Sequence, residues 1–380
     1  MMFYSLLAVV KLVSPVGGEE VRTIDESVER VMSLPTYEAR LAAVKDVRSS
    51  RSWREAAPVV FVWTADKDDG KVFEFRLGKD PERMTLRGVR LEASSGTADG
   101  RVTYRYQMPQ ANLEVGASYV WSVRPRDAKE SPAVGRFVTQ DLAPRWIALE
   151  GRVHNVRDIG GRRTIDGRRV RQGLVYRGEG LNDNRLILKE AGPNRLTVED
   201  QRYLVNTLGI RTDLDLRSSG EIGNLAESPM GPSVRLVSNP SRAYKGIFEP
   251  EGQAAIRRSF ALLADKENYP IYFHCIGGAD RTGSLAYLLQ GVLGVSEHDA
   301  ETDWELTFYP NRLPELTSDY TGPEFWRREG HLREGLAKFG SAESTWHQRI
   351  EAYLTACGVS KAEIESIRTI LLEKESEHAD

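Results

Sequence analysis

The chain has 380 residues, of which 40% are hydrophobic and 28% are charged, and its formal net charge at pH 7 is −3. This length predicts two domains, and a pI of 6.2 argues against a nucleic-acid partner, because a basic binding face raises the pI well above that value. With two cysteines, Cys275 and Cys357, and no clustered histidines, the sequence indicates neither a disulfide scaffold nor a zinc site.

The chain opens with a short apolar run, Phe3 to Val10, which Lys11 interrupts. The run lacks a basic start and a small-residue cleavage site, so it makes a poor signal peptide, and it is far too short to span a bilayer. Two alternatives stay open: a first β-strand, which we favour, and the remnant of a signal peptide. The compartment therefore stays open between the cytoplasm and an exported or periplasmic location, and no transmembrane span is expected.

Residues 20–56 show apolar side chains at helical spacing, with Asp25 and Ser27 as candidate N-caps. Pro35 is expected to divide this stretch into two short helices, because proline cannot continue a helix interior. Residues 1–56 are thus predicted to form an N-terminal segment of one strand and two helices.

Residues 57–142 change character to short runs rich in Val, Phe, Tyr and Thr, separated by turns rich in Asp and Gly. This pattern predicts an antiparallel β-sandwich with Trp63, Tyr119 and Trp121 in its core. The stretch "ASYVWSVRPRDAKESPAVGRFVTQ" resembles the last strands of a fibronectin type III domain. The resemblance implies an all-β immunoglobulin- or fibronectin-like module that acts as a spacer or binds an unknown partner.

A linker, "DLAPRWIALEG", leads into a mixed α/β pattern over residues 150–375. Thr197 is an expected N-cap, and Gly358 and Ser360 are expected to end one helix and begin the next. We expect a central mixed sheet flanked by helices. The predicted helices cover residues 197–209, 254–265, 282–294 and 342–374, and the predicted strands cover residues 210–218 and 269–275.

The stretch "HCIGGADRTG", residues 274–283, lies between a predicted strand and an apolar helix. A strand, a glycine-rich loop and a helix N-terminus form an anion site, because the loop N–H groups and the positive helix end converge. Cationic neighbours and the helix end lower the pKa of a cysteine here, which makes Cys275 a candidate nucleophile. Arg281 offers a planar fork for two phosphate oxygens, and Thr282 offers a hydroxyl to stabilise the leaving thiolate.

This stretch resembles the His-Cys-x5-Arg-Ser/Thr signature of cysteine-dependent phosphatases of the protein-tyrosine-phosphatase superfamily. Residues 154–181 resemble the Asn-x-Arg-Asp-x-Gly-Gly opening of the bacterial tyrosine/serine phosphatases, and residues 215–217 resemble their Asp-Leu-Arg strand. The resemblance covers about residues 150–375. It implies metal-independent, cofactor-free hydrolysis of phosphotyrosine, or of phosphoserine and phosphothreonine, on a phosphorylated protein or small monoester through a phosphocysteine on Cys275.

The resemblance also implies roles for the other motif residues. Phosphate contacts are implied for Ile276, Gly277, Gly278, Ala279, Arg281, Thr282 and Gly283. Supporting roles are implied for His274, Asn155, Arg157 and Asp158.

Two aspartates are candidates for the general acid that protonates the leaving group. The chain has no aspartate between Asp215 and Asp265, so the upstream acid loop of classical tyrosine phosphatases has no counterpart here. Asp280 is therefore the first candidate, as the resemblance to the bacterial group also implies, and Asp158 is the second. A structural role stays open for each: Asp280 as a brace for the loop or its arginine, and Asp158 as part of a turn.

The substrate class has one indicator inside the loop. Relatives with broad phosphoinositide activity have lysine before the aspartate, where this chain has Ala279. The difference favours phosphoproteins or small monoesters, and a phosphoinositide or inositol-phosphate phosphatase stays the alternative. Arg242, Tyr244 and Lys245 either recognise the substrate or belong to a solvated charged loop. A catalytically silent phosphate-binding or adhesion module is the non-enzyme alternative.

Overall fold

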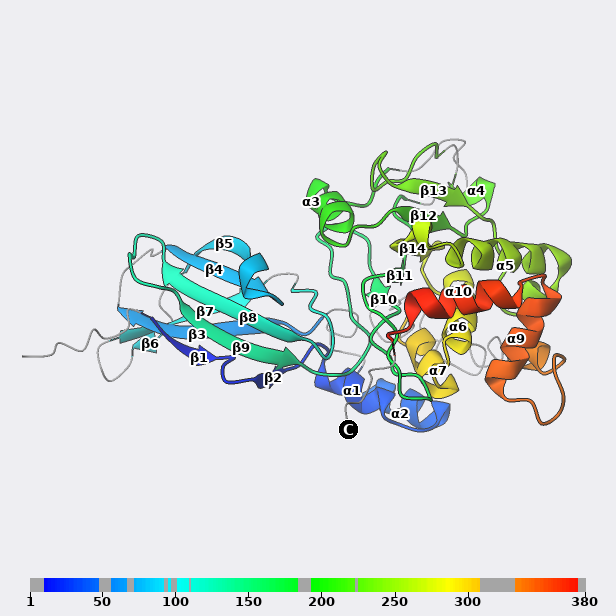
Figure 1. Cartoon of the computed structure of the whole chain (residues 1–380), viewed down its shortest axis with the longest axis horizontal. Coiled ribbons are helices and arrows are strands. Elements are labelled where there is room, and N and C mark those ends of the chain that lie inside the picture. The colour runs from blue at the N-terminus through cyan, green and yellow to red at the C-terminus, as the bar shows by residue number, and fades with distance from the viewer. Residues whose placement is uncertain are drawn as a thin grey trace, which may run out of the picture. The chain divides into compact units, whose positions relative to one another are not determined.

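A computed structural model describes residues 10–47, 56–66, 72–91, 95–96, 101–108, 111–183, 193–222, 225–307 and 332–374. The chain forms two compact units, Met1–Thr23 with Ala56–Leu142 and Ile24–Glu55 with Ala143–Asp380 (Figure 1). The predicted first strand, Phe3 to Val10, lies outside the described residues except for Val10, where a strand begins.

The first unit contains two sheets, with strand orders β1–β3–β7–β6 and β2–β9–β8–β4–β5 (Figure 1). Neighbouring strands are antiparallel except for β2 and β9, which are parallel. The strands are β1 (Val10–Ser14), β2 (Glu19–Val21), β3 (Val59–Asp66), β4 (Val72–Gly78), β5 (Thr85–Arg90), β6 (Ser95–Gly96), β7 (Arg101–Met108), β8 (Ser118–Pro125) and β9 (Ala133–Thr139).

Aromatic side chains from both sheets share one core. The ring of Phe61 on β3 lies 4.7 Å from that of Phe75 on β4, in an edge-to-face arrangement that aromatic pairs favour. Trp63 and Trp121 are completely buried and Tyr119 is 8% exposed, which confirms the three predicted core aromatics. The likeness of this unit to a fibronectin type III domain stays a prediction.

Two short helices, α1 (Glu26–Met32) and α2 (Tyr37–Val47), lie on either side of Pro35 as predicted. Asp25 is the N-cap, and its carboxylate accepts a hydrogen bond from the Ser27 N–H. Arg40 of α2 makes a buried ion pair with Glu305 at 2.6 Å. Both residues belong to the second unit, so this pair fixes α2 within it.

The second unit is mixed α/β and is built around one sheet with the order β10–β11–β14–β12–β13 (Figure 1). The strands are β10 (Arg157–Asp158), β11 (Val175–Gly178), β12 (Thr212–Asp215), β13 (Arg235–Ser238) and β14 (Ile271–His274). Strand β14 is central and pairs in parallel with β11 and β12, whereas β10 is antiparallel to β11. The sheet is therefore mixed, as the sequence predicted.

Alternating side chains of β14 point to opposite faces of the sheet. Ile271 and Phe273 enter one core, which also contains residues of α5 (Pro250–Leu263), α6 (Asp280–Val292), α9 (Trp346–Ala356) and α10 (Lys361–Leu371). Tyr272 enters another core with Leu204, which lies on the turn Tyr203–Thr207 that follows α3 (Val198–Arg202). Both faces of the central strand are thus covered, which explains why all four of its residues are buried.

Most predicted helix ends are confirmed by caps. Thr197 and Ser360 each form a capping box, and Gly358 has the left-handed φ of +88° expected after a helix. Two starts are earlier than predicted. Helix α5 begins at Pro250, since proline suits a first helical turn, and α6 begins at Asp280, so Asp280 and Arg281 belong to the helix rather than the loop.

Strand β12 is buried on both faces, although two of its four residues are aspartates. All four of its residues are buried, including the carboxylates of Asp213 and Asp215. Buried carboxylates need partners, and both lie near the end of β14 that leads into the candidate site. Within the described residues, no helix has both the length and the apolar character to cross a bilayer.

Candidate active site

A short loop, residues 275–279, joins the carboxyl end of β14 to α6 and is called the glycine loop below. In α/β sheets, ligands bind outside the carboxyl ends of parallel strands. The N-terminus of α6 follows the loop directly, and no side chain caps it. Its first N–H groups therefore lack a side-chain cap, as expected where a helix receives an anion.

The glycine loop has its four successive carbonyl oxygens, from Cys275 to Gly278, each held by a separate polar group. In order, these groups are His274 Nδ1 at 3.1 Å, the Gly180 N–H at 3.0 Å, Asn155 Nδ2 at 3.2 Å and the Arg177 guanidinium at 2.8 Å. In a trans peptide the carbonyl and the N–H point in opposite directions. Holding the carbonyls outward therefore turns the loop N–H groups inward, toward the space an anion would occupy.

Glycine is required at two places around this loop. Gly278 has a φ of +64°, and a Cβ atom there would lie 2.4 Å from the Gly178 carbonyl oxygen. A Cβ atom on Gly283 would lie 2.1 Å from Nε1 of the buried Trp304. Gly277 has no left-handed φ, so of the two loop glycines only Gly278 needs the conformational freedom of glycine.

The Cys275 side chain is 2% exposed. Burial raises the pKa of its thiol, but the Arg281 guanidinium and the hydroxyl and N–H of Thr282 oppose this effect, and the net pKa lies below the ordinary value. Cys275 therefore holds a thiolate more readily than a free cysteine does.

His274 is buried and is held by two aspartates of β12. Its Nε2 lies 2.9 Å from Asp213 and 3.9 Å from Asp215, while its Nδ1 faces the Cys275 carbonyl oxygen. Burial lowers the pKa of His274, but the two carboxylates raise it more, so its net pKa lies above the ordinary value. The resemblance implied a supporting role for His274 next to Cys275, and this arrangement is consistent with that role.

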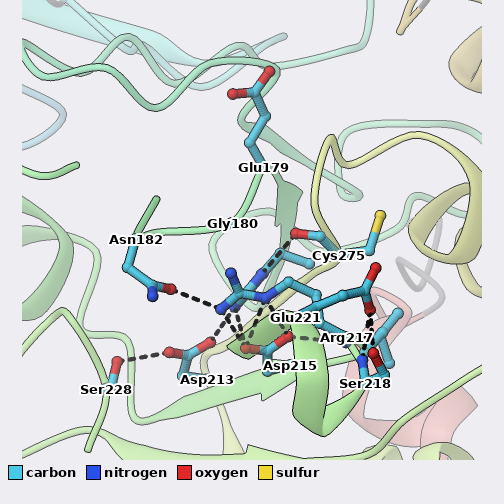
Figure 2. A network of polar contacts seen from close by, with 12 residues as sticks. Glu179, Gly180, Asn182, Asp213, Asp215, Arg217, Ser218, Glu221, Ser228 and Cys275 are labelled. Atoms are coloured by element: carbon cyan, nitrogen blue, oxygen red, sulfur yellow. Dashed lines mark hydrogen bonds and ion pairs between the residues drawn. The ribbon is translucent and has the colours of Figure 1, made fainter. Parts of the chain in front are cut away.

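Arg217 extends the buried polar contacts of His274, because it pairs with Asp215. Figure 2 shows its guanidinium between Asp215 and Asn182, with Asp213 bound in turn by Ser228. The Arg217–Asp215 distance is 2.6 Å, and both side chains are almost completely buried. Gly180 lies against the loop as well, since a Cβ atom there would lie 3.0 Å from the Cys275 carbonyl oxygen.

Asp303 of α7 (Glu297–Glu305) is the centre of a buried cluster of arginines. Arg157 and Arg162 each approach it at 2.9 Å and Arg177 at 2.7 Å. Burial raises the pKa of Asp303, but the three guanidinium groups hold it well below the ordinary range. Burial, together with the positive charge of Arg157, lowers the pKa of Arg177 to about 9.

Asn155 and Arg157 connect this cluster to the glycine loop. The Arg157 guanidinium donates to Asn155 Oδ1 at 2.5 Å, and Asn155 has a left-handed φ of +60°. Its amide then reaches the loop carbonyls. The structure thus places the predicted supporting residues Asn155 and Arg157 behind the loop.

Asp158 is the last residue of β10, and its carboxylate braces the turn that follows rather than contacting the glycine loop. Its two carboxylate oxygens accept hydrogen bonds from the N–H groups of Gly160 at 2.8 Å and Gly173 at 2.6 Å, and Arg145 lies 3.4 Å away. A carboxylate fixed by backbone groups in this way braces a turn. The geometry therefore favours the structural role for Asp158.

Asp280 occupies the first turn of α6, one residue before Arg281. Its carboxylate Oδ1 accepts a short hydrogen bond from the Tyr244 hydroxyl. Tyr244 belongs to the 3-10 turn Tyr244–Phe248, so this loop does contact the site, but through Asp280. Asp280 is partly exposed, whereas the carboxylate of Asp158 is completely buried.

Arg281 binds Glu221 through both of its terminal nitrogens, at 2.6 and 2.9 Å. Glu221 lies on the short helix α4 (Ser219–Ile222) and also accepts hydrogen bonds from the N–H and hydroxyl of Ser218 (Figure 2). Burial raises the pKa of Glu221, but Arg281 and Ser218 lower it, and the net direction is downward.

A pocket of about 620 Å³ opens beside Arg281. Arg242 and Arg258 line it together with Glu221 and Glu251. Arg242 pairs with Glu251 at 2.9 Å at the surface. A larger pocket of about 1030 Å³ lies at the opposite end of α6, and none of the glycine-loop residues lines it.

Three residues that contact the site could not be identified from the sequence. Glu221, Arg177 and Asp303 carry no motif of their own, although Arg177 lies within the "YRG" stretch that resembles the bacterial phosphatases. Among the described residues, no group of His, Cys, Asp and Glu side chains is arranged to hold a metal ion.

Comparisons with known proteins agree with the geometry. Residues 147–373 match the model of the tyrosine phosphatase family. A protein named as a candidate tyrosine-protein phosphatase of Cupriavidus necator is 30% identical over 188 residues, which are 41% of this chain. The chain spans 64% of the length of that relative. A tyrosine-protein phosphatase of Nostoc commune is 24% identical over 217 residues, 49% of this chain and 74% of that protein.

Among solved structures, the core catalytic domain of a PP-IP phosphatase from S. cerevisiae is 15% identical. The structural match covers 44% of this chain and 93% of that domain, with a TM-score of 0.25. A likeness of this size supports no argument about the fold or the substrate.

The lowered pKa of Cys275 predicts a thiol that reacts at a lower pH than a free cysteine does. Because alkylation requires the thiolate, the rate of reaction with iodoacetamide should rise with pH and reach half its maximum below about pH 8.5, the value for a free cysteine. In Arg281→Ala the midpoint should move upward, because the main opposing charge is gone. The Cys275→Ser variant provides the baseline from Cys357, whose pKa burial raises. A wild-type midpoint at or above that of free cysteine would contradict the assignment.

The buried Asp303 cluster predicts a large stability loss when the carboxylate is removed. Asp303→Asn leaves three buried guanidiniums without their counter-ion, so the free energy of unfolding should fall by about 3–5 kcal/mol in urea titrations. Asp166→Asn is the matched control, since its pair with Arg168 is 49% exposed on the carboxylate side and should contribute less than about 1 kcal/mol. Equal losses of unfolding free energy in the two variants would show that the Asp303 cluster stabilises the fold no more than an exposed ion pair does.

Proposed function

We propose that this chain, which belongs to the tyrosine phosphatase family, hydrolyses phosphate monoesters without a metal, through a phosphocysteine intermediate on Cys275. The observation that carries the proposal is the glycine loop with its four carbonyls held outward, between a cysteine of lowered pKa and Arg281. Loop N–H groups, a helix N-terminus and a guanidinium fork are together suited to a tetrahedral dianion.

In the first step, the Cys275 thiolate attacks phosphorus while the bond to the leaving oxygen breaks. The loop N–H groups and Arg281 stabilise the equatorial oxygens, whose charge is spread in the transition state. In the second step, water attacks the phosphocysteine, phosphate is released and the thiolate reforms. Thr282 lies beside the sulfur and stabilises it as the leaving group.

Asp280 is proposed as the general acid and base. It gives a proton to the leaving alkoxide in the first step and takes one from the attacking water in the second. Its place in the first turn of α6, next to Arg281, supports this role, and the backbone bonds that hold Asp158 disfavour the alternative. Phosphotyrosine is the proposed substrate class, because Ala279 supplies no extra cation for multiply phosphorylated head groups.

The proposal for the first unit is more general. We propose that its two sheets form a fibronectin-like module that binds a partner or acts as a spacer. The shared aromatic core of Phe61, Phe75, Trp63 and Trp121 supports a stable module of this kind.

Cys275→Ser should abolish turnover of both p-nitrophenyl phosphate and a phosphotyrosine peptide, because serine has no thiolate at neutral pH. The measurement is initial rate on a panel that also contains phosphoserine peptide and inositol phosphates. Cys357→Ser is the control and should keep full activity. Activity that survives in Cys275→Ser would overturn the proposed function, and a preference for inositol phosphates would overturn the substrate class.

Asp280→Asn should lower kcat by about 10²–10⁴-fold on esters with poor leaving groups, which need a proton as the bond breaks. The loss on p-nitrophenyl phosphate should be much smaller, since p-nitrophenolate leaves without protonation. The measurement is the dependence of kcat on the pKa of the leaving alcohol. A loss of the same size across all leaving groups would contradict the acid role.

A further inference from the structure

Tyr244 is held in a backbone conformation that a large side chain rarely adopts. Its φ is +53°, in the left-handed region that normally favours glycine or asparagine. Backbone outliers of this kind persist only where surrounding contacts fix them, and they are frequent at functional sites. The contacts of Tyr244 therefore indicate what the conformation serves.

Three separate contacts fix Tyr244, one with α7 and two with the start of α6. Its ring stacks on the buried Trp304 with centroids 5.5 Å apart and planes 7° from parallel. Its N–H donates to Ser284 Oγ at 3.2 Å, and the same hydroxyl donates to the Asp280 carbonyl oxygen at 2.9 Å. Its own hydroxyl donates to Asp280 Oδ1. Ring, backbone and hydroxyl thus all position the tyrosine relative to Asp280.

We propose that Tyr244 is a positioning residue for Asp280 in the reaction proposed above, and this inference rests on that proposed function. With the tyrosine hydroxyl on Oδ1, the other oxygen, Oδ2, is left to carry the transferred proton. Oδ2–H gives its proton to the leaving alkoxide as the S–P bond forms and the P–O bond breaks. Oδ2 then takes a proton from the attacking water as the S–P bond breaks. The hydroxyl of Tyr244 keeps its proton throughout.

This role differs from both alternatives that the sequence left open for this loop, substrate recognition and a solvated charged loop. Tyr244 and Lys245 are absent from the residues that line the pocket beside Arg281, whereas Arg242 lines it. The turn Tyr244–Phe248 therefore acts on the site through the carboxylate of Asp280. Because rotation of that carboxylate is restricted, proton transfer loses less entropy at the moment of reaction.

The test is Tyr244→Phe, which keeps the ring stack on Trp304 and removes only the hydroxyl. For an ester with a poor leaving group, kcat should fall about tenfold, a part of the 10²–10⁴-fold that a positioned acid contributes. On p-nitrophenyl phosphate, kcat and KM should stay within about twofold, since departure of p-nitrophenolate needs little help from an acid. An unchanged KM also shows that the loop has folded. In an Asp280→Asn background, Tyr244→Phe should have no further effect, because the group it positions is absent.

The matched control is Tyr287→Phe. The Tyr287 ring also lies against Trp304, at 5.8 Å, and its hydroxyl also donates to a carboxylate, Glu297, at 2.9 Å, but Glu297 is the first residue of α7 and is not the proposed acid. This variant should match the wild type on both substrates. Equal losses on good and poor leaving groups, or a tenfold loss that persists without the Asp280 carboxyl, would overturn the proposal. Neither result would affect the role of Cys275, which Cys275→Ser tests separately.

Discussion

Each peptide group in the glycine loop carries one carbonyl and one N–H that point in opposite directions, so fixing one fixes the other. Four carbonyls in succession are held by groups from different segments of the chain: β14 itself, the Gly180 N–H, Asn155 and Arg177 of β11. A loop constrained in this way needs little rearrangement to bind an anion. The chemistry proposed for Cys275 and Arg281 depends on this preorganisation, because Cys275 begins the loop and Arg281 lies in the helix turn that directly follows it.

Helix α7 supports the site from two sides through adjacent residues. Asp303 gathers the three arginines, one of which holds Gly278, and Trp304 carries the ring of Tyr244, which holds Asp280. The C-terminal end of the glycine loop and the first turn of α6 therefore share one support. Trp304 also packs directly against Gly283 of α6, because any side chain at that position would collide with it.

Features set by neighbouring residues could be predicted from the sequence, and features set by folding could not. The caps at Asp25, Thr197 and Ser360 and the buried strand β14 follow from local patterns. The contact of Arg157 with Asp303 joins residues 146 positions apart, and that of Arg281 with Glu221 spans 60 positions. No local pattern distinguishes these two carboxylates from the many others in the chain, and only the assembled sheet brings them to the loop.

The ion pair between Arg281 and Glu221 means that the arginine already has an anionic partner before any substrate arrives. A phosphate group that uses both guanidinium nitrogens has to take the place of this carboxylate, so binding is an exchange of anions. Such an exchange favours ligands that carry more negative charge than a single carboxylate. A phosphate dianion gains from it, whereas carboxylic acids and sulfate esters gain little. In the reaction proposed for this site, Glu221 would therefore compete with the substrate for Arg281 and favour doubly charged ligands.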